Sequence, residues 1–537
     1  MAWLRSTLQY HLGYWICVCS FIIFLLYFIL FAKVFIPNPD IFAIRTEFGS
    51  EPGDVENKAN LPQQPPEGEH ANSALQVTPL KQTALAPPVP EVYGTTDKPP
   101  AAQLQILNKN AELKNLTAAV QPQEVHIKTA FRKFNQKLVE ALTSNEAILL
   151  PLTFDEDHLT WKEPLPSVYI YSAFLEFDSS GSPYVRIISM VLAKPEHRDT
   201  VQCLVKGDNL VASPPASLDI LPDGHGQRFS AAFYVCMLQD VPGILQHTSL
   251  QVTLTNGTQP RDPAWVSVLM KEKITNEFAM CMQPFYNQRN HLVQMAEFIA
   301  YYSLMGVSRF TFYIFDMSKA EELFLLRLRA RKNVTIVLLR WDIRITQIHM
   351  LGQIAALQDC MHRERFYSEY MVYVDLDEFM VPKVTRDFRE TMRIVQKRRK
   401  YSSFNVLHKP FCMEFKNTTS LSELEIPLVT RIYDVRDTLE WPHEQRSKWI
   451  GRTKDVVSGG IHFARVLEDN KEALYLNASQ MLLHHYRDGC GVLAVIRPTG
   501  LVHVLKDGST VKDSYMSMYT TDILNADAIS FVRSLLG

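Results

Sequence analysis

Three carboxylates stand close together in the stretch YMVYVDLDEFMVP, which runs from Tyr370 to Pro382. They belong to Asp375, Asp377 and Glu378. The apolar residues before them indicate a strand that enters a core, and buried carboxylates are costly unless positive charge meets them. In extended chain, residues i and i+2 face the same side, so Asp375 and Asp377 are expected to converge on one point. The spacing therefore predicts a cation between them.

A divalent metal ion is the cation that fits two converging carboxylates. Two such groups a few Å apart repel, and one takes up a proton unless a cation sits between them. Mg²⁺ and Mn²⁺ prefer oxygen ligands and leave positions for phosphate and water. We therefore expect Mn²⁺ or Mg²⁺, carrying a diphosphate, at Asp375 and Asp377. In the alternative interpretation, Asp377 and Glu378 cap the following turn and Asp375 pairs with an arginine.

Strands and helices alternate from about residue 276 onward. Four apolar runs have the pattern of strands, at residues 278–285, 309–316, 334–342 and 371–375. Apolar side chains at helical spacing fill the segments between them, and repeated βαβ units imply a parallel sheet with right-handed crossovers. Ligands of such sheets bind at the carboxyl ends of the strands. Asp316, the Tyr286–Asn287 turn and Asp375 all lie at such ends.

The region from about Phe278 to Asp488 resembles the proteins of glycosyltransferase family 92. The matching segments, in chain order, are CMQP with YN, EFIAYYSLMGVSRFTFYIFD, GQIAALQDCMHRER, YVDLDEFMVP, KWIGRTKDV with GGIHFARV, and HHYRD. The resemblance implies an α/β fold of the GT-A type, which is Rossmann-like with a mostly parallel sheet. It also implies a nucleotide-sugar donor, Mn²⁺ and inversion at the sugar carbon. Characterised relatives transfer galactose from UDP-galactose in β linkage, so a β-galactosyltransferase with a glycan or glycoprotein acceptor is expected.

The resemblance assigns roles at the metal. Asp377 would bind the ion directly, and Asp375 would reach it through water or contact the ribose. GT-A enzymes often supply a late histidine to the metal, and His485 is the candidate here. His484 and His462 are the alternatives, since an isolated histidine is more often structural than ligating.

Six further residues are expected around the donor: Tyr286, Asn287, Arg289, Asp316, Arg452 and Lys454. The first three form a turn that would face the nucleotide, and the fourth would lie on the uridine side. The two basic residues at the end of this series would neutralise the diphosphate. In the alternative interpretation the tyrosine only packs and the basic residues are solvated surface charges.

A base for an inverting transfer is the least defined part of the sequence. Such a transfer needs one carboxylate to remove the proton of the acceptor hydroxyl, with no covalent intermediate. Glu440 and Glu444, in TLEWPHEQ, are the candidates, because the neighbouring Trp441 offers an aromatic face to a sugar ring. The stretch 411–440 matches the family pattern poorly.

Residues 122–275 have a different rhythm, mostly of period two. Short runs rich in Val, Ile, Tyr and Phe are separated by Gly, Pro, Asp and Asn, which predicts an antiparallel, sandwich-like β domain. Cys203 and Cys236 would lie on two of its strands. No group of reactive residues stands out, so we interpret it as a packing or acceptor-presenting module before a catalytic domain at 276–537.

The N-terminal part is expected to anchor the chain in a membrane. Residues 12–32 carry no charge and form about 31 Å of helix, enough to cross a bilayer core. The run is long for a signal peptide and lacks a small-residue cleavage site, so we expect a retained anchor with residues 1–11 in the cytosol. Residues 33–121 are rich in proline and poor in large apolar side chains, which predicts a disordered stem.

Several features favour a lumenal body, and the family resemblance implies a single-pass type II protein of the Golgi membrane. Five N-glycosylation sequons follow the anchor, at Asn115, Asn256, Asn333, Asn417 and Asn477. The six cysteines beyond the anchor show no C-x-x-C spacing and could form up to three disulfides, whose pairing the sequence leaves open. The formal net charge of -2 gives no general attraction to nucleic acid.

Two other functions compete with a glycosyltransferase. A catalytically silent family member could act as a lumenal glycan-binding or scaffolding protein, although the intact Asp-Leu-Asp argues against it. A metal-dependent phosphohydrolase is disfavoured, because its second aspartate is commonly followed by Thr or Val, whereas Glu378 follows Asp377 here.

Overall fold

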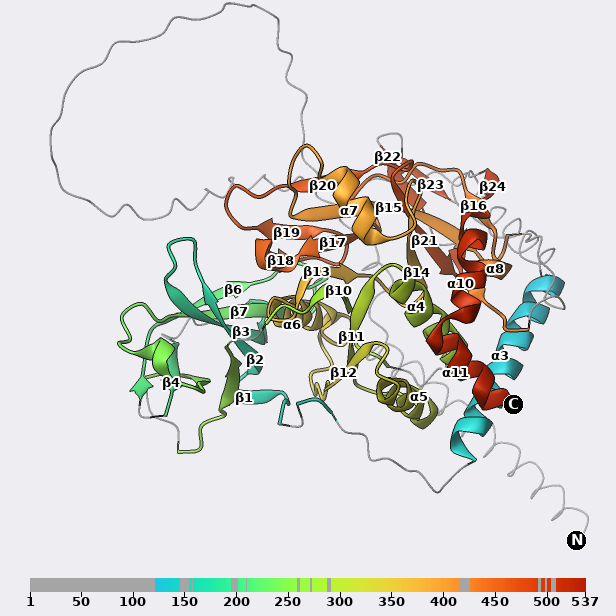
Figure 1. The fold of residues 1–537 in the computed structure, drawn as a ribbon. Coiled ribbons are helices and arrows are strands. Elements are labelled where there is room, and N and C mark those ends of the chain that lie inside the picture. Colours follow the sequence, from blue (N-terminus) through green and yellow to red (C-terminus); the bar gives the residue numbers. More distant parts are fainter. Residues whose placement is uncertain are drawn as a thin grey trace, which may run out of the picture. The chain divides into compact units, whose positions relative to one another are not determined.

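The computed structural model describes residues 121–144, 154–156, 158–194, 201–208, 210–257, 261–270, 273–286, 291–415, 425–490, 494–497, 500–503 and 509–537. This part of the chain is a mixed α/β structure with two large sheets (Figure 1). The predicted anchor and nearly all of the predicted stem lie outside it. Within it, every helix is too short or too polar to cross a membrane.

The first sheet has nine strands. They are β1 (Lys162–Leu165), β2 (Val168–Phe177), β3 (Pro183–Leu192), β4 (Gln202–Lys206), β5 (Val211–Ala212), β6 (Ala216–Ile220), β7 (Phe229–Met237), β8 (Gln251–Thr255) and β9 (Val266–Leu269). Their order is β5-β4-β8-β9-β2-β3-β7-β6, with β1 beside β2. All pairs are antiparallel except β2 with β9.

This sheet folds over on itself. Four strands separate β4 from β7 in the sheet order, yet a disulfide joins Cys203 on β4 to Cys236 on β7, with 6.0 Å between their Cα atoms. Side chains from both ends of the sheet, among them Val205 and Tyr234, share one buried core. The result has the sandwich-like character that the period-two pattern indicates, and both cysteines lie on strands as predicted.

The second sheet also has nine strands. They are β10 (Asn276–Cys281), β11 (Val307–Ile314), β12 (Thr335–Arg340), β13 (Ser368–Tyr373), β14 (Glu378–Pro382), β15 (Ser403–Cys412), β17 (Lys448–Arg452), β20 (Ala473–Leu476) and β21 (Met481–Arg487). The order is β12-β11-β10-β13-β17-β15-β21-β14, with β20 beside β15. The first four strands are parallel, as the βαβ pattern predicts, whereas the other half is mixed.

Helices and small strand pairs complete the described part. The helices are α3 (Gln121–Thr143), α4 (Leu292–Leu304), α5 (Lys319–Ala330), α6 (Gln353–Glu364), α7 (Phe388–Val395), α8 (Val429–Ile432), α10 (Thr520–Asn525) and α11 (Asp527–Leu536). The strand pairs are β16 (Val435–Asp437) with β24 (Thr510–Lys512), β18 (Val456–Gly459) with β19 (Ala464–Leu467), and β22 (Ala494–Arg497) with β23 (Gly500–His503). Ser318 and Glu321 form a full capping box at the start of α5.

Helix α3 is not predicted from the sequence, because its residues are assigned to the start of the β domain. Ile127, Phe131, Leu138 and Leu142 recur at helical spacing and are buried. They join the core of the second sheet, where α3 contacts α4, α5 and α11 (Figure 1). The N-terminal boundary at residue 122 therefore does not mark the start of the β domain, because α3 packs with the second half of the chain.

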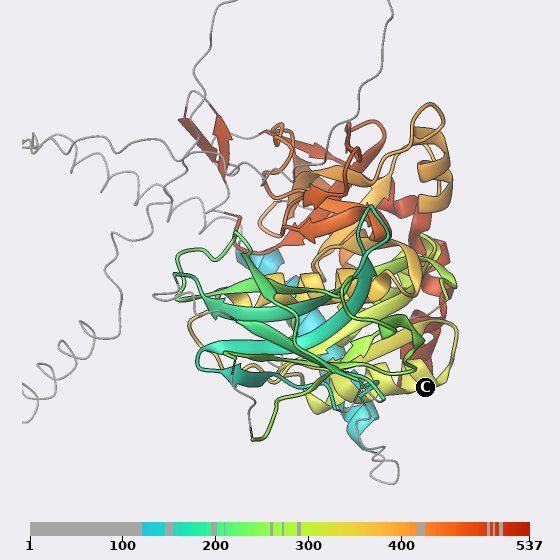
Figure 2. The same cartoon turned by 90° about the vertical axis from the view of Figure 1, so that its left-hand side faces the viewer.

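Helix α6 lies between the two sheets and contacts β2, β3 and β7 on one side and β10 and β13 on the other. In Figure 2 the strands of the first sheet face the viewer, in front of the second sheet. The contact is unusually polar for a core. Asp359 on α6 accepts hydrogen bonds from Ser172 of β2 and Tyr313 of β11 and pairs with Arg363, which also bonds Glu156.

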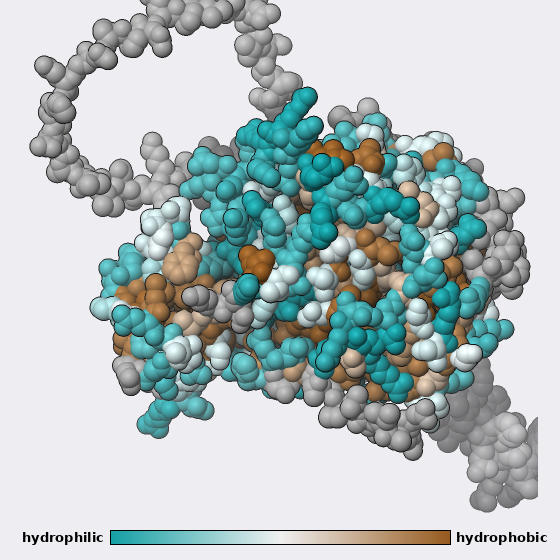
Figure 3. Space-filling model, viewed as in Figure 1, coloured by the Kyte–Doolittle hydropathy of each residue, from teal (hydrophilic) through white to brown (hydrophobic). Residues whose placement is uncertain are grey.

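Polar residues cover most of the described surface on the face shown in Figure 3, and apolar residues appear there in separate small groups. Helix α6 covers the apolar face of the first sheet that lies toward the second sheet. Met190, Phe233 and Leu357 belong to a single core that spans both sheets. The two halves thus share buried surface as one domain does.

We expect residues 276–537 to fail to fold when produced alone. The truncation would expose the core shared with the first sheet. It would also remove Ser172 and Glu156, which are partners of the buried Asp359 and Arg363, and a buried polar group that loses a partner costs about 1–3 kcal/mol. Near-ultraviolet circular dichroism and limited proteolysis of this fragment should show no fixed tertiary structure. Residues 121–537, produced in parallel, should be folded; a folded, protease-resistant 276–537 fragment would contradict the shared core.

Candidate active site

The acidic motif lies in the turn between β13 and β14 of the second sheet, beyond the carboxyl end of β13. Strand β13 ends at Tyr373, β14 begins at Glu378, and the amide of Glu378 donates to the carbonyl of Asp375 at 3.1 Å. The expectation that Asp375 and Asp377 sit in extended chain is therefore wrong. The turn forms because the side chain of Glu378 reaches back and accepts from the Asp375 amide at 2.8 Å.

The place of this turn in the sheet is the one expected for ligand binding. The parallel strands run in the order β12-β11-β10-β13, so the chain reverses its direction of growth between β10 and β13. Ligands of open α/β sheets bind at such a switch point, beyond the carboxyl ends of the strands. Asp375 follows the carboxyl end of β13.

Lys448 supplies positive charge to the acidic turn from within the protein. It opens β17, which pairs with β13, and its buried ammonium lies 2.9 Å from Asp375 Oδ2 and 3.5 Å from Glu378 Oε2. Burial by itself lowers the pKa of Lys448, but the two carboxylates outweigh burial and raise it. Lys448 is therefore a fixed cation, and it takes the place that the alternative interpretation gave to an arginine.

His485 lies beside the second acid of the turn. Strand β21 pairs with β14 so that His485 stands opposite Glu378. Its Nε2 is 3.2 Å from Asp377 Oδ2 and its Nδ1 is 3.5 Å from Glu378 Oε1. Partial burial raises the pKa of Asp377, but attraction to His485 outweighs it and holds that pKa below its ordinary value.

The two alternative histidines lie elsewhere. His484 points to the other side of the β14–β21 ladder, where its Nε2 is 3.3 Å from Lys383 Nζ and its ring stacks on Phe411. His462 is held by the carbonyl of Ser447 at 3.1 Å, and burial lowers the pKa of its imidazole to about 4. Of the three histidines, only His485 has a described contact with the acidic turn.

His408 backs His485 from inside the protein. It is fully buried on β15, with its Nε2 3.0 Å from Nδ1 of His485 and its ring edge-on to Trp441. A histidine that binds a metal through one ring nitrogen usually has the other held by a hydrogen bond. Nothing in the sequence singles out His408, because it lies far from the other residues of the site along the chain.

The residues at the turn supply the ligand types of a divalent ion, although the ligand atoms of Asp375, Asp377 and His485 do not all lie within 4.8 Å of one another. Asp375 Oδ1 is buried and has no hydrogen-bond partner among the described residues, while the Asp377 side chain is 48% exposed. Together with the imidazole of His485 they offer the oxygen and nitrogen ligands that Mn²⁺ accepts. Three acids face one lysine here, so the net charge leaves room for a cation. These residues could hold the ion, and Lys448 would keep Asp375 in place.

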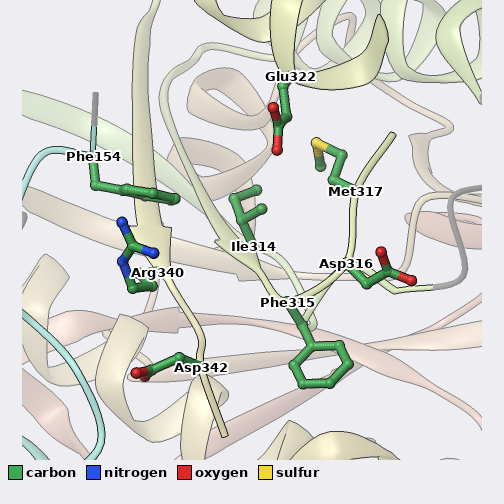
Figure 4. Close-up of a pocket in the computed structure, with 8 residues that line it drawn as sticks. All are labelled: Phe154, Ile314, Phe315, Asp316, Met317, Glu322, Arg340 and Asp342. Carbon is green, nitrogen blue, oxygen red and sulfur yellow. The ribbon is translucent and has the colours of Figure 1, made fainter. Parts of the chain in front are cut away.

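A cavity of about 450 Å³ opens at the carboxyl ends of β11 and β12, along the same edge of the sheet. Asp316, which is expected on the uridine side, is one of the residues that line it. Phe154, Glu322, Arg340 and Asp342, for which the sequence predicts no role, also line it (Figure 4). The Arg340 guanidinium lies 4.3 Å from the centre of the Phe154 ring. An aromatic ring beside polar groups is the usual lining of a small-molecule site.

The Tyr286 turn is described only in part. Tyr286 lies after the end of β10. Its hydroxyl is 3.8 Å from the sulfur of Met350, which belongs to the segment before α6. This position lies at the carboxyl edge of the sheet, as predicted. Asn287 and Arg289 lie outside the described residues.

Arg452 and Lys454 are not brought to the acidic turn. Arg452 stands opposite Tyr370 at the start of β13, and it pairs with Glu369 at 2.9 Å. Lys454 is exposed beyond it. Both lie at the far end of the strand pair from Asp375, because β17 runs antiparallel to β13. The predicted role in neutralising a diphosphate does not agree with this placement.

The two glutamates that are expected to supply the catalytic base, Glu440 and Glu444, do not have the expected surroundings. Trp441 is buried, and its indole N–H donates to Asp437 at 2.8 Å, so its face is not open to a sugar. Glu444 is exposed and accepts from the Tyr475 hydroxyl at 2.6 Å. Glu440 is exposed as well. Neither glutamate has a described contact with the acidic turn, so the geometry does not select a base.

We expect His485→Ala to lower metal affinity and transfer about 10- to 100-fold, the usual cost of disturbing a metal site or its support. The comparison variant is His443→Ala, whose partly buried imidazole bonds Asn405 at 2.7 Å and has no described contact with the acidic turn. Mn²⁺ binding followed by electron paramagnetic resonance, together with UDP release, would test this. Equal effects of the two substitutions would remove His485 from the site.

The fold and the site define a mixed α/β protein that carries an acidic cluster at a ligand-binding sheet edge. Residues 276–525 match the sequence model of the family described as Glycosyltransferase family 92. Over these residues the sequence matches glycosyltransferase family 92, in agreement with the resemblance of its motifs. A beta-1,4-galactosyltransferase of Caenorhabditis elegans, galt-1, is 22% identical over 340 residues, which cover 60% of this chain and 74% of the worm protein.

Proposed function

We propose that this glycosyltransferase moves galactose from UDP-galactose to a glycan acceptor with inversion, in a Mn²⁺-dependent reaction. The observation that carries the proposal is the acidic turn at the strand switch point, with Lys448 and His485 against its carboxylates. The choice of galactose draws on the name of the similar C. elegans protein. The choice of a GT-A type fold draws on the parallel half of the second sheet.

The chain's own residues would divide the work as follows. Asp375, Asp377 and His485 would hold the ion, which when bound supplies positive charge to the donor diphosphate. Lys448 fixes Asp375 and Glu378 through its buried ammonium. The cavity lined by Asp316 and Arg340 lies on the same sheet edge and would take the nucleoside. Such preorganised charge stabilises the leaving UDP without rearrangement during the reaction.

We further propose that the protein acts in the Golgi lumen as a single-pass type II membrane protein. The uncharged run at residues 12–32 supports an anchor. Three disulfides close among the described cysteines, Cys203–Cys236, Cys281–Cys360 and Cys412–Cys490, which supports an oxidising compartment. Immunofluorescence of the full-length chain against a Golgi marker, with protease protection of its C-terminus, would test this.

A donor screen tests the activity. The full-length chain would be incubated with UDP-galactose, UDP-glucose, UDP-N-acetylglucosamine or UDP-N-acetylgalactosamine, with Mn²⁺ or EDTA and a panel of glycan acceptors. We expect UDP release from UDP-galactose with Mn²⁺ only, and a product sensitive to β-galactosidase. No UDP release with any donor, together with no Mn²⁺-dependent UDP binding, would instead support the silent, glycan-binding alternative.

A further inference from the structure

A second cavity, of about 720 Å³, lies where β14, β16 and β24 meet. Its walls include Lys383, Arg436, Lys512, Asp513, Tyr515 and Met518. The volume is within the range of small-molecule sites. Nothing in the proposed transfer reaction uses these residues.

This cavity is separate from the acidic turn. Glu378 begins β14 and Lys383 directly follows its last residue, so the two lie about 16 Å apart along extended chain. They also face opposite sides of the ladder, because Glu378 contacts His485 whereas Lys383 contacts His484. A ligand in this cavity would therefore not touch the proposed donor site.

Positive charge is in excess in the cavity. Three cationic side chains line it, whereas one carboxylate, Asp513, stands in its wall and a second, the buried Asp434, pairs with Lys512 at 3.3 Å. Asp513 is already engaged: its Oδ1 accepts from the Tyr515 amide at 3.1 Å and its Oδ2 from Arg436 Nε at 2.7 Å. The Lys383 side chain is only 9% exposed, and its Nζ lies 3.7 Å from Asp513 Oδ2. Burial is the main reason that the pKa of Lys383 falls to about 8, and repulsion from Arg436 adds to it. The surroundings of Lys383 thus favour a further negative charge.

The same cavity presents an apolar wall. Tyr515 is 41% exposed and Met518 is 43% exposed. The Lys383 ammonium lies 3.9 Å from the centre of the Tyr515 ring, and the Tyr515 hydroxyl is fixed by the Lys383 carbonyl at 2.8 Å. A rigid aromatic ring with a polar edge suits a ligand that has an apolar face and hydroxyl groups, and a sugar ring has both.

We propose that this cavity is a second, non-catalytic saccharide-binding site, which takes an acidic sugar of a glycan. The carboxylate or sulfate of that sugar would meet Lys383, Arg436 and Lys512, and its ring would lie on Tyr515. Charge-assisted hydrogen bonds to buried or partly buried cations are the stronger kind. The site does not depend on the proposed transfer activity.

Binding of two tetrasaccharides to the full-length chain tests the proposal. The acidic probe is a hyaluronan tetrasaccharide, the neutral match is chitotetraose, and inorganic phosphate represents the anion alone. Calorimetry should show that the acidic tetrasaccharide binds at least about tenfold more tightly than the neutral one, and that binding weakens as salt rises. Lys512→Glu and Tyr515→Ala should each weaken it by about tenfold.

Lys471→Glu is the matched control, because Lys471 is an exposed lysine paired with the buried Asp455, as Lys512 is paired with the buried Asp434. It should leave binding unchanged. Asp377→Ala should leave binding unchanged too, which separates this site from the proposed function. Three outcomes would overturn the proposal: no binding of the acidic tetrasaccharide, equal loss in the Lys471 variant, or displacement by phosphate at the same concentration, which would indicate a simple anion site.

Discussion

Asp377→Ala is expected to abolish sugar transfer while the protein stays folded. The side chain is 48% exposed and has His485 as its described partner, so its loss should change the free energy of unfolding by about 0.5 kcal/mol or less. The charge that a metal ion supplies to a departing diphosphate is worth several kcal/mol. If about 4 kcal/mol is lost, the rate of transfer falls about 10³-fold.

UDP release, Mn²⁺ affinity and thermal unfolding should be measured together on this variant. The matched control is Asp522→Ala, because that carboxylate is 50% exposed and also has one cationic partner, Arg386 at 3.0 Å. The control should keep both activity and metal affinity. Turnover by Asp377→Ala close to that of the control would show that the acidic turn does not hold the metal.

Lys448→Met is expected to have the largest effect on stability. Lys448 is buried between Asp375 and Glu378. Burial raises the pKa of Glu378 to about 7. Removal of one member of a buried ion pair leaves an uncompensated charge and costs about 3–5 kcal/mol. Because Asp375 would also lose its support, transfer should fall by about tenfold or more.

Chemical denaturation of Lys448→Met should be compared with Lys454→Met. Lys454 is the lysine that the sequence analysis expects to neutralise the diphosphate, and its side chain is exposed. Its substitution should change stability by no more than about 0.5 kcal/mol and leave transfer intact. If Lys454→Met were the more damaging variant for transfer, the assignment of the fixed cation to Lys448 would be wrong.

The parallel half of the second sheet could be predicted because its signals are local. The strands of residues 276–373 alternate with helices at recognisable spacing, and the capping box at Ser318 marks a helix start. The same reasoning placed Asp316 and Asp375 at strand ends, where the structure has them. Helix α3 was missed although its apolar side chains recur at helical spacing, because its segment was assigned to the following β pattern.

The partners of the acidic turn could not be predicted in the same way. Lys448 follows Asp375 by 73 residues and arrives through the antiparallel pairing of β17 with β13, which no local pattern reveals. His485 was chosen through family resemblance, whereas His408 was missed because only strand pairing of β15 with β21 brings the two together. Trp441 was misjudged because its burial depends on Asp437 and His408.

The three disulfides share a simple order along the chain. Each one joins a cysteine to the next cysteine in the sequence of the described part, Cys203 to Cys236, Cys281 to Cys360 and Cys412 to Cys490. The covalent loops therefore neither overlap nor enclose one another. During synthesis, which delivers the chain from its N-terminus, the correct partner of each thiol is the next one to emerge. Oxidation can then follow translation step by step, without the exchange of wrong pairs that interleaved bridges require.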